Sequence, residues 1–178
     1  MIRVTPVTQT KADWFESFLD TYRGDAIRLS WRLLGPHRHL AEDVVQQAFV
    51  KAWHKRSSFR GTSSPKTWVY RIIVNQVRSY QRWHSVRVRA MGWLKPSPEL
   101  TGSTPVESDY GLQQRIAEAV SLLSQQQREA FVLVYLDGLK VREAAEVLNR
   151  AEGTVKSHLH RAVGKLRKEL EDVWETHR

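Results

Sequence analysis

Residues 137–161 carry the pattern that decides the fold, and they read DGLKVREAAEVLNRAEGTVKSHLHR. An Asp-Gly pair ends the helix predicted before it, and a short helix follows that holds Ala144 and Ala145. These alanines have little bulk, so a second helix can cross them closely at a steep angle. Asn149 suits a left-handed turn, and Gly153 lies at the start of a basic helix whose first amides are free to bind phosphate. A short helix, a tight turn and a basic helix in this order indicate a helix-turn-helix.

The exposed face of the last helix, predicted over residues 152–173, carries the side chains that would contact DNA. The predicted set is Thr154, Lys156, Ser157, His160, Arg161 and Lys165. A recognition helix reads base edges near its N-terminus, so we assign Lys156, Ser157 and His160 to base or groove contacts. Arg161 and Lys165 are assigned to the phosphate backbone. The alternative is a solvated amphipathic helix of a plain bundle, but the whole pattern favours DNA binding.

The remaining sequence predicts further helices, and no stretch alternates as a strand would. They are expected over residues 13–34, 39–55, 66–83, 112–123, 125–136 and 141–148. Proline, glycine and serine recur between residues 96 and 111, which indicates a linker. We therefore predict an all-α protein of two small helical domains, residues 10–87 and 112–174, joined by a flexible linker over residues 88–111.

Charge favours a polyanionic partner. The chain has 28 Lys and Arg against 19 Asp and Glu, a formal net charge of +9, and no acidic residue lies between Arg60 and Lys95. A one-signed segment of this length creates a local electrostatic field that attracts nucleic acid or an acidic membrane surface. A membrane-surface module is one alternative, although polar Asn75 and Gln76 within the third predicted helix disfavour it.

Composition disfavours enzyme chemistry and membrane insertion. There is no cysteine, which excludes disulfides, cysteine nucleophiles and zinc knuckles. His158 and His160 point about 200° apart on a helix, so we expect no metal site there. Clustered carboxylates and a Gly-rich phosphate loop are both missing, and no apolar run approaches the roughly 20 residues that span a bilayer. We expect a cytoplasmic protein that is not an enzyme, with no metal, no cofactor, no small-molecule substrate and no direct membrane insertion.

Several segments, taken together, resemble a known family. They are AEDVVQQAFVKAW at residues 41–53, FRGTSS at 59–64, KTWVYRIIVN at 66–75, and the stretches around residues 122–128, 137–139 and 153–162. In order and spacing they resemble regions 2 and 4 of the extracytoplasmic-function (ECF) RNA polymerase sigma factors. The resemblance extends from about residue 15 to residue 170. It implies a sigma region 2 bundle followed by a sigma region 4 helix-turn-helix.

The resemblance implies a contact with bacterial core RNA polymerase. The second helix would dock on the β′ clamp helices, and the C-terminal domain on the β flap. The implied residues on that helix are Glu42, Asp43, Gln46, Gln47, Phe49 and Trp53. Polar side chains beside aromatic ones suit a polar-rimmed protein interface. The alternative is a plain solvated helix face.

The resemblance also implies recognition and melting of a promoter minus-10 element, while the helix-turn-helix would bind the minus-35 element. The implied minus-10 residues are Phe59, Arg60, Ser63, Ser64, Tyr70, Arg71, Asn75 and Arg78. A base leaves the duplex only if stacking and hydrogen bonds in a pocket offset its unstacking. Asn75 would touch the separating strands, and Arg71 and Arg78 would hold phosphates. We expect Tyr70 and Trp83 to stack on bases, and Trp68 to lie in the core.

The implied function is a sigma factor that directs core polymerase to promoters and assists strand opening. The nearest alternative is a free-standing helix-turn-helix regulator, which leaves the N-terminal match unexplained. By resemblance, the linker would enter the active-site channel, and an anti-sigma factor would mask both DNA-binding faces. The chain departs from the family pattern at Pro65, Arg150, Ala151 and Glu152, which bears on promoter choice and not on the fold.

Overall fold

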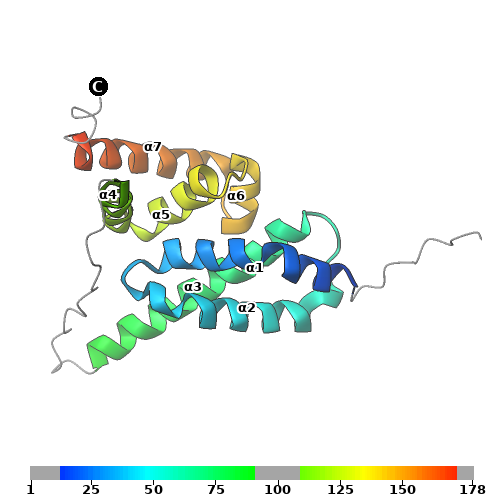
Figure 1. The fold of residues 1–178 in the computed structure, drawn as a ribbon. Coiled ribbons are helices and arrows are strands. Elements are labelled where there is room, and N and C mark those ends of the chain that lie inside the picture. The colour runs from blue at the N-terminus through cyan, green and yellow to red at the C-terminus, as the bar shows by residue number, and fades with distance from the viewer. Residues whose placement is uncertain (1–12, 91–108, 172–178) are drawn as a thin grey trace, which may run out of the picture.

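The computed structural model describes residues 13–90 and 109–171, and within these ranges the chain is helical with no strand (Figure 1). The all-α prediction is confirmed. The α-helices are α1 (Asp13–Leu34), α2 (Ala41–Lys55), α3 (Pro65–Ala90), α4 (Asp109–Ser121), α5 (Gln125–Phe131), α6 (Val141–Leu148) and α7 (Glu152–Glu169). Three short segments complete them: the 3-10 helices η1 (Gly35–Leu40) and η2 (Arg56–Ser58), and the π-helical turn η3 (Val132–Leu136).

Helix α3 begins where its sequence provides a cap. Ser64 Oγ accepts a hydrogen bond from the backbone N–H of Thr67 at 3.0 Å, and Pro65 occupies the first helical position. Proline fits there because its missing N–H would have no partner within the helix. The helix then continues to Ala90, beyond the end predicted near residue 83. Both ends of the predicted linker, residues 88–111, are therefore helical, because α3 ends at Ala90 and α4 begins at Asp109. Its middle, residues 91–108, lies outside the described residues.

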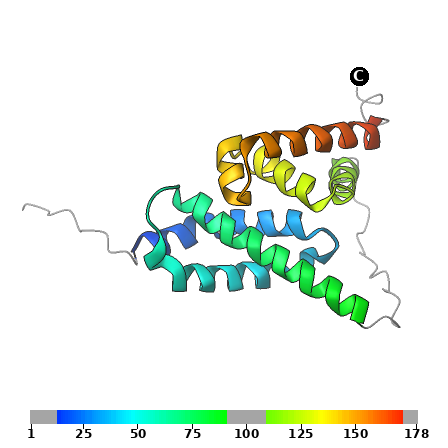
Figure 2. The same cartoon turned by 180° about the vertical axis from the view of Figure 1, so that it is seen from behind.

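Helices α1, α2 and α3 pack together as the N-terminal half (Figures 1 and 2). The apolar stripe of α2 is buried as its spacing predicts. Its buried members are Ala41, Val44, Val45, Ala48 and Ala52. Phe49 and Trp53, placed on the same stripe by the sequence, are only partly buried. They lie at the edge of the stripe, where an aromatic ring can contact both the core and a partner.

The C-terminal half contains α4 to α7 and the expected helix-turn-helix. Ser124 begins α5 with a reciprocal capping box, in which its hydroxyl accepts from the N–H of Gln127 and the Gln127 side chain accepts from the N–H of Ser124. Asn149 has φ 53°, the left-handed conformation expected for the turn between α6 and α7. Ala144 and Ala145 are buried beneath α7 and its neighbours.

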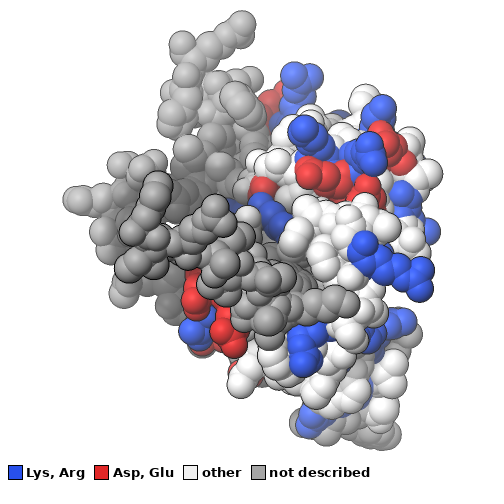
Figure 3. All heavy atoms as spheres, turned by 90° about the vertical axis from the view of Figure 1, so that its right-hand side faces the viewer, with Lys and Arg blue, Asp and Glu red and all other residues white. Residues whose placement is uncertain are grey.

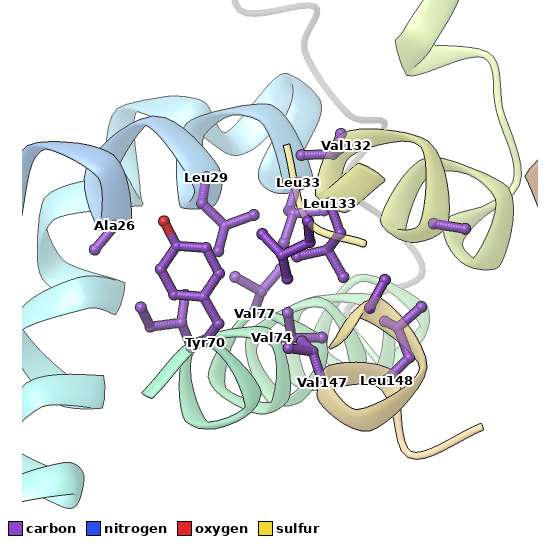
Figure 4. Close-up of a cluster of buried hydrophobic side chains, with 14 of the residues drawn as sticks. Ala26, Leu29, Leu33, Tyr70, Val74, Val77, Val132, Leu133, Val147 and Leu148 are labelled. Carbon is purple, nitrogen blue, oxygen red and sulfur yellow. The ribbon is translucent and has the colours of Figure 1, made fainter. Parts of the chain in front are cut away.

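The two halves share one hydrophobic core. Figure 4 shows Leu29 and Leu33 of α1 and Val74 and Val77 of α3 directed toward side chains of η3 and α6. Leu133 of η3 is fully buried in this cluster. The views in Figures 1 and 2 agree that α5 and α6 lie against the N-terminal bundle. In this conformation the halves are packed together and are not held by the linker alone.

None of the helices in the described ranges is both long enough and apolar enough to cross a membrane.

We predict that Leu133→Ala lowers the free energy of unfolding by about 3 kcal/mol, because it removes a fully buried side chain and leaves a cavity. The measurement is urea denaturation followed by circular dichroism. Leu122→Ala is the matched control, since Leu122 is 53% exposed, and should cost less than about 1 kcal/mol. Equal losses for the two variants would contradict the placement of Leu133.

Candidate functional site

The predicted DNA-reading face of α7 is exposed. Val155, Leu159 and Ala162 point into the core, so the intervening side chains face solvent. Among the predicted contact residues, those exposed on α7 are Thr154, Lys156, Ser157, His160, Arg161 and Lys165. Figure 3 shows basic side chains in the upper and lower parts of one face of the molecule, with acidic ones interspersed among them. The charge is therefore mixed locally, and a DNA contact must come from particular side chains.

Lys165 has a structural partner that its sequence position did not reveal. Its Nζ donates to the backbone carbonyl of Leu122 at 2.6 Å, which ties α7 to the chain just after α4. A charged amine at an unsatisfied helix-end carbonyl interacts favourably with the helix dipole. Lys165 therefore positions α7, whereas Arg161 has no such tie among the hydrogen bonds of the described residues. Ser157 Oγ donates to Gly153 O at 3.0 Å within the helix.

A groove of about 470 Å³ runs between α1 and α2 and is open to solvent. Five of the six residues predicted to contact polymerase line it: Glu42, Asp43, Gln46, Phe49 and Trp53. From α1 come Phe15, Leu19, Arg23 and Ile27, which sequence reasoning did not assign. The Phe15 and Trp53 rings lie 5.7 Å apart and form the apolar floor. Val50, 52% exposed, adds an apolar side chain that the buried stripe of α2 leaves uncovered.

Gln47, the sixth predicted residue, is not part of this groove. Its Oε1 accepts from Gln76 Nε2 at 2.6 Å, and Gln76 Oε1 accepts from Lys51 Nζ at 2.5 Å. This chain of hydrogen bonds joins α2 to α3. Gln76 is buried, so the network satisfies a polar group that would otherwise destabilise the bundle. The structure places Gln47 as an interhelical contact.

The loop before α3 is anchored at both ends. The rings of Phe59 and Trp68 lie 5.5 Å apart, which fixes the start of the loop against α3. At the other end Ser64 Oγ caps α3 and lies 2.8 Å from Thr67 Oγ1. Arg60 is exposed between these anchors, and Ser63 is half-buried. The loop thus presents Arg60 to solvent between two anchored ends.

The prediction that Tyr70 stacks on a base is wrong for this conformation. Its side chain is 1% exposed, and burial raises the pKa of its phenol well above the usual range. Tyr70, Ile73, Val74 and Val77 follow the i, i+3, i+4, i+7 spacing of one buried helix face. That spacing was visible in the sequence. Trp83 is 54% exposed, as a stacking residue would need to be.

A polar pocket of about 320 Å³ lies between α3 and α5. It is lined by Asn75, Arg78, Ser79, Arg82 and Gln125. Asn75 is exposed there, so the structure brings two predicted minus-10 residues, Asn75 and Arg78, into one concave surface. Arg71, on the same helix, is half-buried, and its Nε has no hydrogen-bond partner among the described residues.

Arg78 is engaged by the other half of the chain. Its Nε and Nη2 donate to Glu129 Oε1 and Oε2 at 2.8 and 2.6 Å, a bidentate pair. The hydrogen bond to Glu129 raises the pKa of Arg78 above its ordinary value, although burial opposes the shift. Glu129 is buried and also accepts from Gln125 at 3.1 Å. No sequence signal assigned Glu129.

Asp137, which follows the helix predicted over residues 125–136, is a second buried carboxylate at the junction of the halves. Its Oδ1 accepts from Arg32 Nη1 of α1 at 2.8 Å. Burial raises the pKa of Asp137 to about 6, while the positive charges of Arg32 and Lys66 act in the opposite direction. The residue is therefore poised to change charge near neutral pH.

No group of three or more His, Cys, Asp or Glu side chains that could hold a metal ion occurs in the part of the chain that the structure describes.

Comparison with known proteins identifies the family. The family model for sigma-70 region 2 matches residues 18–85, and the model for sigma-70 region 4 matches residues 113–166. The ECF RNA polymerase sigma factor SigW of Bacillus subtilis is 30% identical, over 96% of each chain. SigL of Mycobacterium tuberculosis is 32% identical, over 97% of this chain and 98% of its own length.

Solved structures agree with these matches. The sigma factor RpoE from Bartonella quintana, in complex with the anti-sigma factor NepR, has a TM-score of 0.75 and 29% identity, over 88% of this chain and 96% of that one. CnrH, in complex with the cytosolic domain of CnrY, has a TM-score of 0.64 and 25% identity, over 89% and 88%. The fold and its two matched regions define a sigma factor of the sigma-70 type. The chain belongs to the ECF RNA polymerase sigma factors. The sigma factor prediction is thereby confirmed over the free-standing regulator.

We predict that acidification stabilises the fold through Asp137. The raised pKa means that the folded state binds a proton more tightly than the unfolded state, so this stabilisation is present below about pH 4 and is lost as the pH rises through about 6. In Asp137→Asn the change in unfolding free energy between about pH 5 and about pH 7.5 should be smaller than in the wild type. Urea denaturation across this range is the measurement.

Asp20→Asn, at an exposed carboxylate of α1, is the control and should keep the wild-type pH dependence. An Asp137→Asn profile parallel to the wild type would show that this carboxyl does not titrate in the interval.

Proposed function

We propose that the groove between α1 and α2 is the docking site for core RNA polymerase, and that the C-terminal half contacts the β flap. The groove supports this because it combines an aromatic floor with an acidic and polar rim, as protein interfaces do. Its lining residues all come from α1 and α2 and none from α5 or α6, so packing of the halves leaves it open. The single observation that carries the proposal is the convergence of Glu42, Asp43, Gln46, Phe49 and Trp53 on this one groove.

The loop at residues 59–64 and the polar edge of α3 are the proposed minus-10 reader. Phe59, Arg60, Ser63 and Ser64 belong to the anchored loop, whereas Asn75, Arg71 and Arg78 follow on α3. Cationic and amide side chains in a concave surface suit a displaced DNA strand, whose phosphates and base edges are both accessible. Tyr70 is left out of this set because its ring is buried.

The exposed face of α7 is the proposed minus-35 reader, with Lys156, Ser157 and His160 in the major groove and Arg161 on the backbone. Lys165 acts on this contact through its tie to Leu122. Glu152 in the first turn of α7 interacts favourably with the helix dipole. Its negative charge would repel a DNA phosphate placed at that point.

The chain acts by positioning polymerase on DNA in the cytoplasm and performs no catalysis of its own. RpoE and CnrH were solved with NepR and with the cytosolic domain of CnrY, which supports an anti-sigma factor as a further partner of this chain.

We expect the purified chain to give defined transcript starts when it is mixed with bacterial core polymerase and a library of randomised promoters. Sequencing of the starts should show two enriched upstream elements. Phe49→Ala should reduce polymerase binding and starts together, because Phe49 lines the groove. His54→Ala is the matched control, since His54 is exposed on α2 outside the groove. If the wild type produces neither starts nor polymerase binding, the proposed function is wrong.

Arg161→Ala should weaken binding of the polymerase complex to every minus-35 sequence and reduce the slope of log K against log salt by about one, the loss of one phosphate contact. Fluorescence anisotropy with duplex DNA at several salt concentrations measures the slope. Lys168→Ala, near the far end of the same helix, should leave the slope unchanged. Equal slopes for Arg161→Ala and the wild type would refute the phosphate contact.

A further inference from the structure

The face of α3 that points away from α1 and α2 is covered by the C-terminal half. Val74 and Val77 are 0% and 2% exposed, and Figure 4 shows them beside Val147 and Leu148 of α6. Leu133 of η3 completes the contact. Separation of the halves would expose these apolar side chains to water, which is unfavourable. Burial of these side chains therefore favours the closed arrangement.

At the edge of this contact, Glu129 holds Arg78. A carboxylate accepting two parallel N–H bonds from a guanidinium has the same fork geometry as a phosphate. Gln125 donates to the same carboxylate and sets its position. Arg78 thus already has the kind of partner that a DNA backbone would offer.

Two further ties join the halves. Arg32 of α1 donates to Asp137 Oδ1 and, at 3.2 Å, to the carbonyl of Leu136. Arg128 donates to the carbonyls of Ser121 and Leu123, and at 3.4 Å to that of Leu33 at the end of α1. A cation shared by the C-terminal ends of two helices neutralises both dipoles. The contact is therefore polar at its rim and apolar at its centre.

The closed arrangement is too small to read two promoter elements at once. Minus-10 and minus-35 positions differ by about 25 base pairs, or roughly 85 Å of duplex at 3.4 Å per pair. A compact chain of this length has a radius of gyration of about 16 Å, hence a diameter of roughly 40 Å. The halves must therefore separate before both elements are bound.

We propose that Glu129 is an internal substitute for a promoter phosphate, which holds the free chain closed and withholds Arg78 and the neighbouring surface of α3 from DNA. The groove between α1 and α2 and the exposed face of α7 stay open in this state. Polymerase can therefore bind first, and separation of the halves then releases Arg78 for DNA. This inference rests on the proposed assignment of Arg78 to the minus-10 contact.

The test measures closure directly in the full-length chain. Because the chain has no cysteine, Glu16→Cys on α1 and Lys168→Cys on α7 can carry two spin labels without further changes. Glu129→Gln keeps the size of the side chain but removes its charge. We expect double electron-electron resonance to show a ratio of long to short distances that is roughly tenfold higher in Glu129→Gln than in the wild type. This ratio corresponds to a shift of about 1.4 kcal/mol in the equilibrium between the closed and open arrangements. Glu171→Gln, an exposed carboxylate, should match the wild type.

A second readout concerns DNA. Binding of a labelled pool of random single-stranded 20-mers to the free chain should tighten in Glu129→Gln, and this gain should disappear in the double variant Arg78→Ala, Glu129→Gln. Circular dichroism confirms that each variant remains helical. Should Glu129→Gln fail to fold, Arg32→Gln removes the guanidinium that ties α1 to Leu136 and Asp137 and should also lengthen the distance.

The outcomes separate the two proposals. Unchanged distances in both Glu129→Gln and Arg32→Gln would overturn closure by these contacts, whatever the transcription assay shows. Longer distances without tighter DNA binding would overturn the role of Glu129 as a phosphate substitute. Defined transcript starts from the wild type report on the proposed sigma function independently of either result.

Discussion

The packing of α3 between two sets of helices is the constraint on which the rest of the structure depends. One side of α3 faces α1 and α2, and the other faces α6. Val69 and Ile73 are fully buried on this helix, and Val74 and Val77 lie beside side chains of α6. Apolar side chains on two sides leave a narrow polar edge that carries Asn75. The proposed DNA contacts and the contact between the halves therefore compete for one helix.

Much of the fold could be predicted because it depends on spacing within single helices. The stripe of α2 and the αL turn at Asn149 both follow from local rules that need no tertiary information. The same rules applied to α3 place Tyr70 on the buried face with Val77, so helical periodicity already argues against base stacking by Tyr70. The start of α3 also depends only on neighbouring residues, because a serine cap followed by Pro65 predicts it.

The remaining contacts could not be predicted, because they depend on where helices distant in sequence cross. Lys165 looked like any basic residue of a recognition helix, yet it bonds to Leu122, across the domain. Gln47 lies beside groove residues in sequence but turns toward Gln76 of α3. Such partners are set by crossing angles and side-chain rotamers. A one-dimensional pattern identifies the helix face and leaves the partner unspecified.

No acidic residue lies between Arg60 and Lys95, so the carboxylate that pairs with Arg78 in the closed arrangement comes from Glu129 in the C-terminal half. No counter-ion for Arg78 exists within that segment, and a partly buried guanidinium without one would be strongly destabilising. The net gain from a buried ion pair is nevertheless small, because desolvation offsets most of the Coulomb attraction. Replacing Glu129 by a phosphate therefore changes the free energy little. Most of the free energy needed to open the chain comes from exposing the apolar side chains between the halves. On the proposed function, binding to polymerase offsets this free energy.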